Sequence, residues 1–241
     1  MEKLTKAQKK ALQKSEWQKE AEAAARKEQM KKFGLWGAVA VLVGIAIFGL
    51  ALFVNKSPTS SIDTSQTVPM SSEYDIVLGN KNSKVSLIEY SDLQCPACAS
   101  YHPLVKQILT EYPNVRYVYR NFPLTNIHPN AQIAAQAGYA ANLQGKFWEM
   151  ADALFTNQPD WEKSPSPQTI FVNYAQKLGL NAEKFTTDMN SQEAKKFVSE
   201  SEKQAISAGI NSTPSFFLNG ARITASSYED FKKLIDDAFE K

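Results

Sequence analysis

Residues 85–98 read VSLIEYSDLQCPAC. Residues 85–91 are apolar on both alternating faces apart from Glu89, which is the pattern of a central strand covered by helices on both sides. Cys95 and Cys98 follow that strand directly, and they are the only cysteines in the 241-residue chain. Two cysteines cannot build a disulfide framework, so their chemistry must lie in this one motif.

The residues after the dithiol extend the pattern into an α/β domain. Residues 98–112 carry apolar side chains at helical spacing, and residues 115–120 are rich in strand-forming residues. The order strand, helix, strand predicts a βαβ unit. A tract without strand signals follows, in which we expect four helices, over 131–143, 147–155, 168–178 and 194–208.

The C-terminal part predicts a hairpin and a closing helix. Residues 215–218 and 221–224 are strand candidates, and the turn dipeptide Asn219-Gly220 separates them. Residues 228–239 form an amphipathic helical pattern. The outline is therefore βαβ, helical block, ββα, which belongs to the α/β class.

The position of the dithiol indicates redox chemistry. A thiol at a helix N-terminus faces unpaired N–H groups and the positive end of the helix dipole, both of which lower its pKa. Cys95 is therefore the expected nucleophile, and Cys98, one turn further on, is placed to attack a mixed disulfide formed at Cys95. Pro96 suits the first helical turn because its missing N–H is not needed there.

Two other interpretations of the dithiol remain open. A fixed surface disulfide is one, although a bridge that closes so short a loop constrains little chain entropy. The other is a metal site, for zinc or Cu(I), because His102 completes the pattern C-x-x-C-x-x-x-H. A closed zinc site needs a fourth ligand, and the chain has no third cysteine.

An uncharged segment precedes the domain. Residues 34–54 read GLWGAVAVLVGIAIFGLALFV, long enough as a helix to cross the hydrocarbon core of a bilayer. No obvious cleavage site follows it, so we expect an uncleaved signal anchor over residues 33–54; a buried core helix is the alternative. Basic residues cluster before it, which predicts a cytoplasmic helical head at residues 1–32 and an outside location for the rest.

Charge and composition separate the remaining parts. Residues 1–32 hold 10 basic and 5 acidic residues of the chain's 27 and 25, which leaves 17 and 20 beyond, so the head is +5 and the rest −3. The larger part thus lacks the basic face that nucleic-acid binding needs. Residues 55–73, rich in Ser, Thr and Pro, are typical of a flexible linker, and the folded domain is expected over 74–241.

Four blocks of sequence resemble the DsbA-like thiol:disulfide oxidoreductases. They are EYSDLQCPAC at 89–98, NFPL with HPNA at 121–131, GKFWEMADALF at 145–155 and GINSTPSFFLNG at 209–220. The resemblance implies a thioredoxin-like fold with an all-helical insertion at about 128–208. It also implies disulfide exchange on reduced exported proteins, with no bound cofactor or metal.

The resemblance assigns roles to particular residues. Cys95 is expected to be an exposed nucleophile and Cys98 its buried partner. The substrate-binding residues are expected to be Pro96, Ala97, Thr213 and Pro214, with a cis bond before Pro214 and backbone hydrogen bonds from Thr213. From the residues alone, Pro214 is equally a proline at a strand start and Thr213 a turn residue.

Glu89 is expected to be a buried acid under the dithiol. Desolvation there would raise its pKa and suit it to shuttle the proton of Cys98. The alternative is that Glu89 reaches a sheet edge and is solvated.

The direction of the reaction and the partners are expectations as well. The resemblance favours a monomeric oxidase that a quinone-coupled membrane protein re-oxidises. Ala97 stands where a histidine often supports the thiolate, so the oxidising strength is open. The rivals are a reductase or isomerase, and a copper-delivery module that uses Cys95, Cys98 and His102.

Overall fold

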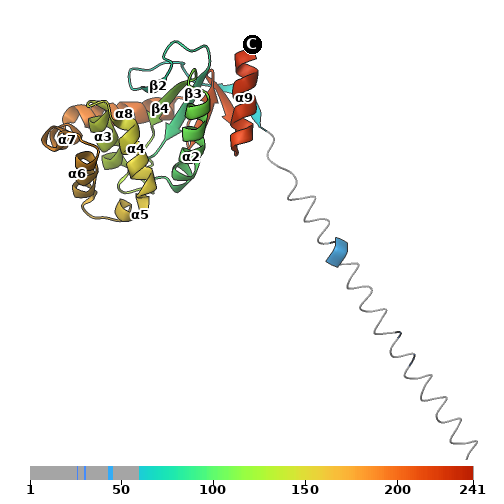
Figure 1. Ribbon diagram of the computed structural model, residues 1–241, viewed down its shortest axis with the longest axis horizontal. Coiled ribbons are helices and arrows are strands. Elements are labelled where there is room, and N and C mark those ends of the chain that lie inside the picture. Colours follow the sequence, from blue (N-terminus) through green and yellow to red (C-terminus); the bar gives the residue numbers. More distant parts are fainter. Residues whose placement is uncertain (1–25, 27–29, 31–42, 46–59, 241) are drawn as a thin grey trace, which may run out of the picture. The chain divides into compact units, whose positions relative to one another are not determined.

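The computed structural model describes residues 60–240 together with residues 26, 30 and 43–45 (Figure 1). The chain divides into two units, Met1–Ser57 and Pro58–Lys241. Most of the expected head and anchor, and the start of the expected linker, lie outside the described residues. Across the residues that are described, no helix is both long and apolar enough to cross a membrane.

A six-stranded mixed sheet forms the centre of the second unit, in the order β1-β6-β5-β3-β4-β2. β3 and β4 are parallel and every other neighbouring pair is antiparallel. The α/β class is therefore confirmed. The strand bounds are β1 Ser61–Thr67, β2 Ile76–Gly79, β3 Ser86–Ser91, β4 Arg116–Asn121, β5 Ser215–Leu218 and β6 Ala221–Thr224.

The strand β1 lies where we expected a flexible linker. It pairs with β6, with Ser61 opposite Thr224 and a register shift before Thr67. Most of its residues are exposed, because an edge strand held mainly by backbone hydrogen bonds needs no apolar face. A composition rich in Ser and Thr was therefore an incorrect guide to flexibility from residue 61 onward.

The helices fall into a pair that packs on one face of the sheet and an inserted block. α2 (Pro96–Glu111) joins β3 to β4, and α9 (Tyr228–Glu240) follows β6. The block between β4 and β5 agrees with the expected insertion at about 128–208, and Figure 1 shows much of it beside the sheet. Its helices are α3 Ala131–Asn142, α4 Phe147–Thr156, α5 Gln158–Trp161, α6 Pro167–Lys177, α7 Ala182–Met189 and α8 Gln192–Ser207.

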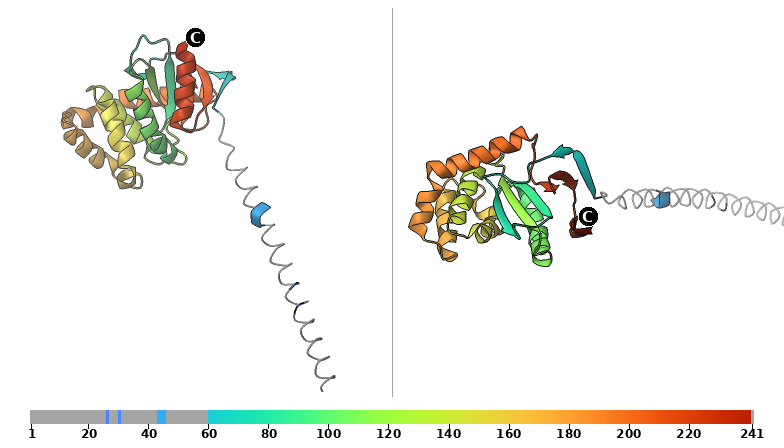
Figure 2. Two further views of the ribbon diagram at one scale, coloured as in Figure 1. Left: turned by 45° about the vertical axis from the view of Figure 1, so that its right-hand side comes forward. Right: turned by 90° about the horizontal axis from the view of Figure 1, so that it is seen from above.

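The two faces of the sheet belong to different cores. Alternate residues of β3 point to opposite faces, so Leu87 joins a core with α2, α4 and α9, whereas Ile88 and Tyr90 join a smaller core with the end of α8. The right-hand view of Figure 2 shows α8 and α2 on opposite faces. Glu89 has the parity of Leu87 and therefore faces the core that contains both cysteines.

The turn between β5 and β6 uses the dipeptide that predicted it. Asn219 and Gly220 both have positive φ, 49° and 83°, as the tightest hairpin turns require. A Cβ at position 220 would also lie 2.9 Å from the carbonyl oxygen of Val68. Glycine is thus required there by both conformation and space.

Candidate active site

The dithiol lies at the N-terminus of α2. Cys95 is the residue that caps the helix, and Pro96 occupies its first turn, as the sequence predicted. The backbone N–H of Cys95 donates to the carbonyl of Asp92 at 3.0 Å, and the Cys95 carbonyl accepts from Ala99 at 3.1 Å. A short turn from β3 thus delivers Cys95 to the helix end.

Both cysteines are free thiols, but their environments differ. The Cys95 thiolate is stabilised first by the Cys98 thiol, and then by the Thr213 side chain and the backbone N–H groups of Cys98 and Ala97, while burial opposes its ionisation. The net effect, to which the Cys98 thiol contributes most, lowers the pKa of Cys95 from 9.0 to about 5. Cys95 is only 6% exposed, so it is less open than the expected exposed nucleophile.

Cys98 has the opposite tendency. It is 1% exposed, and burial raises its pKa well above 9.0, with further contributions from the thiol of Cys95 and the negative charge of Glu89. At neutral pH the pair therefore holds one thiolate, on Cys95, and one thiol, on Cys98.

The loop before β5 lies against the nucleophile. The Sγ of Cys95 is 3.6 Å from the carbonyl oxygen of Thr213, and the Thr213–Pro214 peptide bond is cis, as the resemblance implied. The Thr213 hydroxyl is buried and makes no hydrogen bond of ordinary geometry among the described residues, so its effect on the pKa of Cys95 is that of a nearby dipole. Pro96 and Ala97 are exposed at the surface beside the dithiol.

Glu89 lies in the protein interior, because β3 is a central strand between β5 and β4. It is 5% exposed, and this burial raises its pKa. The hydroxyl of Tyr117 donates a hydrogen bond to its carboxylate. The alternative of a solvated Glu89 at a sheet edge is therefore wrong.

A second acid, Asp92, holds the active-site turn together. Its Oδ1 accepts the Gln94 N–H at 2.8 Å, and its Oδ2 accepts the Leu124 N–H at 2.9 Å and lies 2.6 Å from His128 Nδ1. Sequence analysis did not identify this contact. The signal available was that His128 lies in a resemblance block, yet nothing in the spacing pairs it with Asp92.

His102 does not join the cysteines in a metal site. Its Nε2 lies 2.9 Å from Oδ1 of Asp152, and its ring packs on Phe155. Within the described part of the chain, no group of three or more His, Cys, Asp and Glu side chains is arranged to hold a metal ion. The C-x-x-C-x-x-x-H spacing therefore does not produce the ligand cluster that the metal hypothesis needs.

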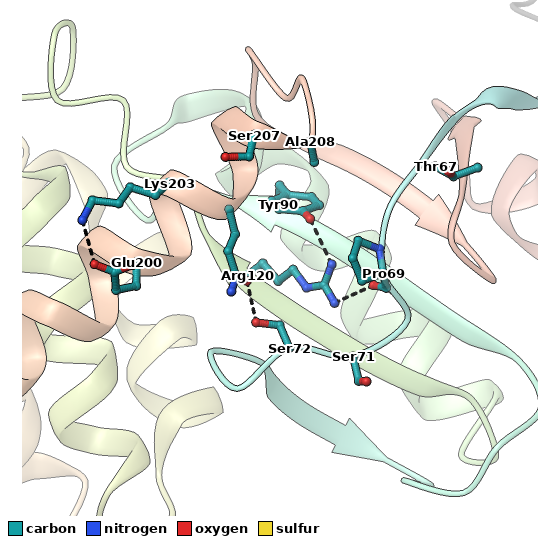
Figure 3. Close-up of a pocket in the computed structure, with 11 residues that line it drawn as sticks. Thr67, Pro69, Ser71, Ser72, Tyr90, Arg120, Glu200, Lys203, Ser207 and Ala208 are labelled. Carbon is teal, nitrogen blue, oxygen red and sulfur yellow. Dashed lines mark hydrogen bonds and ion pairs between the residues drawn. The ribbon is translucent and has the colours of Figure 1, made fainter.

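A cavity of about 570 Å³ lies on the other face of β3, beside the last turns of α8 (Figure 3). Arg120 in its wall bonds Asp75 at 2.6 Å and the Tyr90 hydroxyl at 2.9 Å. Lys203 pairs with Glu200 at 2.7 Å. Because Tyr90 and Glu89 point to opposite faces, this cavity is separate from the dithiol.

Comparisons with known proteins agree with this fold. The family model described as thioredoxin matches residues 71–237. A thioredoxin-like oxidoreductase from Silicibacter pomeroyi has a TM-score of 0.60 at 28% identity and covers 70% of this chain and 95% of its own. Alpha-DsbA1 from Wolbachia pipientis has a TM-score of 0.62 at 21% identity and covers 71% and 94%.

The curated relatives are named as Na(+)/H(+) antiporters and not as thioredoxins. The Na(+)/H(+) antiporter NhaA 1 of Salinispora arenicola is 36% identical over 155 residues, which are 64% of this chain and 23% of that protein. The chain thus spans about a quarter of the length of this relative.

Proposed function

The chain belongs to the thioredoxin family, and on that premise we propose that it is a protein thiol:disulfide oxidoreductase that works through Cys95 and Cys98. The observation that carries the proposal is the asymmetry of the two thiols. Cys95 holds a thiolate with a pKa of about 5, while burial keeps Cys98 protonated. Cys95 is thus ionised and can exchange with a disulfide, whereas Cys98 stays a thiol until a mixed disulfide has formed.

The favoured direction is oxidation of substrates. A substrate thiolate attacks the oxidised Cys95, a mixed disulfide forms, and Cys98 leaves and takes up a proton. A second substrate thiolate then releases the substrate disulfide and leaves Cys95 as a thiolate. Because the bonds to Cys95 stabilise that thiolate, they favour the reduced enzyme and make its disulfide a stronger oxidant.

The substrates and the location belong to the same proposal and rest on the sequence. Residues 33–54 would anchor the chain in the cell membrane, with residues 1–32 in the cytoplasm and the dithiol outside. The substrates would then be reduced exported proteins, and a quinone-coupled membrane protein would restore the disulfide. The antiporter activity in the names of the curated relatives is not carried over, because the match covers only 23% of the Salinispora arenicola protein.

The test is the redox potential of the full chain, equilibrated with reduced and oxidised glutathione. An oxidase should have a potential more oxidising than about −180 mV, the value of a typical disulfide isomerase. A potential near about −270 mV would instead support a reductase. Labelling of Cys95 in intact cells with a membrane-impermeant thiol reagent tests the location, and protection until the cells are lysed would overturn it.

A further inference from the structure

Two buried tyrosines of β4 lie close to Glu89, and they differ in one respect. Tyr117 and Tyr119 are each 1% exposed and share one face of the sheet. Tyr119 lies directly opposite Glu89 in the register with β3, and Tyr117 lies opposite Leu87, one diagonal away. Only Tyr117 reaches the carboxylate with its hydroxyl; the Tyr119 hydroxyl has no hydrogen-bond partner among the described residues.

The Tyr117 hydroxyl acts on the charged form of Glu89 as a hydrogen-bond donor. A donor favours the charged form of an acid over the neutral form. Burial of Glu89 has the opposite effect. The hydrogen bond therefore compensates part of the desolvation that Glu89 undergoes in the core.

We propose that Tyr117 is a positioning residue, whose hydroxyl keeps Glu89 available as a carboxylate base for the proton of Cys98. This inference rests on the proposed function, because it concerns the step in which Cys98 becomes a nucleophile. Tyr117 touches Glu89 and not the reacting sulfur atoms, so it acts through the carboxylate.

The step is defined with glutathione disulfide as the oxidant. The Cys95 thiolate attacks one sulfur of glutathione disulfide, and the first glutathione leaves as a thiolate. Glu89 takes the proton of Cys98, the Cys98 thiolate attacks the Sγ of Cys95, and the second glutathione leaves. The protein dithiol is oxidised by two electrons, and glutathione disulfide is reduced to two glutathione molecules.

Other groups also act on this carboxylate, and the test must separate them from Tyr117. Phe216 of β5 lies opposite Glu89 in the strand register, and Trp148 of α4 packs against Tyr117; neither side chain titrates. The Ser91 hydroxyl of β3 also lowers the pKa of Glu89 and is retained in every variant used below. The titratable groups that act on Glu89 or respond to its charge are Cys95, which caps α2, Cys98 in α2 and Tyr119 in β4. Both thiols and Tyr119 are retained in the variant Tyr117→Phe, which removes one oxygen atom.

The experiment follows the glutathione mixed disulfide of the full chain by acid quenching and mass spectrometry from pH 5 to pH 9. In Tyr117→Phe, the pH midpoint for resolving the mixed disulfide should rise by about one unit, because a hydrogen bond to a charged group contributes on that order. Below the midpoint, resolution should slow about tenfold. Formation of the mixed disulfide should be unchanged, since Cys95 is intact.

Tyr119→Phe is the matched control, because it deletes a buried hydroxyl from the same strand and the same face. It should leave the pH midpoint of resolution unchanged. In a Glu89→Gln background, Tyr117→Phe should cause no further shift.

The outcomes separate this inference from the proposed function. If the wild-type chain forms no mixed disulfide, the proposed function fails. If the mixed disulfide forms and both Tyr→Phe variants resolve it with the wild-type pH midpoint, the role of Tyr117 fails alone. An equal shift in both variants, or a shift that persists with Gln at position 89, would show a general packing effect and also overturn the inference.

Discussion

The Sγ of Cys95 lies 3.6 Å from the carbonyl oxygen of Thr213, although 118 positions separate them in the chain. The sheet produces this contact, because β5, which starts just after Pro214, pairs with β3, which ends just before the dithiol. A peptide that approaches the sulfur must therefore also approach the Thr213–Pro214 loop.

Replacing Cys98 with serine should trap mixed disulfides at Cys95. The nucleophile remains, but the sulfur that would resolve the mixed disulfide is gone. Non-reducing gels of cells that express Cys98→Ser should show reducible adducts, and Cys95→Ser should show none. Equal adduct levels in both variants would contradict the assignment of the nucleophile.

The reduced chain should contain a thiolate down to mildly acidic pH. Ultraviolet absorbance of the thiolate should titrate with a midpoint of about 5, and this transition should be missing in Cys95→Ser. Because folding lowers this pKa, thiolate formation stabilises the reduced fold above the ordinary thiol pKa. That contribution to the free energy of unfolding should be lost as the pH falls from about 9 to about 5. A midpoint near 9 would contradict the stabilisation of the Cys95 thiolate by the N-terminus of α2 and by Cys98.

Glu89→Gln should slow turnover and stabilise the fold. Folding raises the pKa of Glu89, so wild-type stability is highest below the ordinary glutamate pKa and falls as the pH rises through the folded value. The glutamine variant avoids that loss, and its melting temperature should exceed that of the wild type at alkaline pH. Exchange kinetics from pH 5 to pH 9 provide the second measurement; rates equal to wild type at every pH would exclude Glu89 from the mechanism.

Asp92→Ala should destabilise the active-site turn. The variant leaves the buried N–H of Gln94 and the partly buried N–H of Leu124 without their acceptor and releases His128. A loss of about 2–4 kcal/mol in the free energy of unfolding is expected, measured by denaturant titration. The control is Asp237→Ala, at an exposed position of α9, which should stay within about 0.5 kcal/mol of wild type.

The parts of the fold with strong periodicity could be predicted from the sequence. The apolar run around Glu89, the Asn219-Gly220 turn and the amphipathic pattern of α9 were each assigned to the correct element. β1 and β2 could not be predicted, for two different reasons. β1 has the composition of a linker. β2 has only four residues and, unlike the equally short β5 and β6, is not joined to its partner strand by a two-residue turn.

Of the candidate site, only the residues that belong to one local sequence motif could be predicted. Cys95 caps α2 and Cys98 lies in its first turn, so the spacing of the motif alone predicts that the two thiols lie together. The partners of Glu89 and Asp92 could not be read in the same way, because Tyr117 and His128 reach them from elements distant in the chain. Periodicity places a side chain on a face, and register decides which neighbour it touches.

The alternation along β3 makes the site sensitive to insertions outside the C-P-A-C motif itself. Adding a single residue near the start of β3 would slide the strand by one position and turn every side chain over. Tyr90 would then point at the thiols, and the carboxylate would face Arg120 on the other side of the sheet. Such a protein would retain its C-P-A-C sequence and lose the carboxylate beneath it, whereas an insertion of two residues would keep each side chain on its own face.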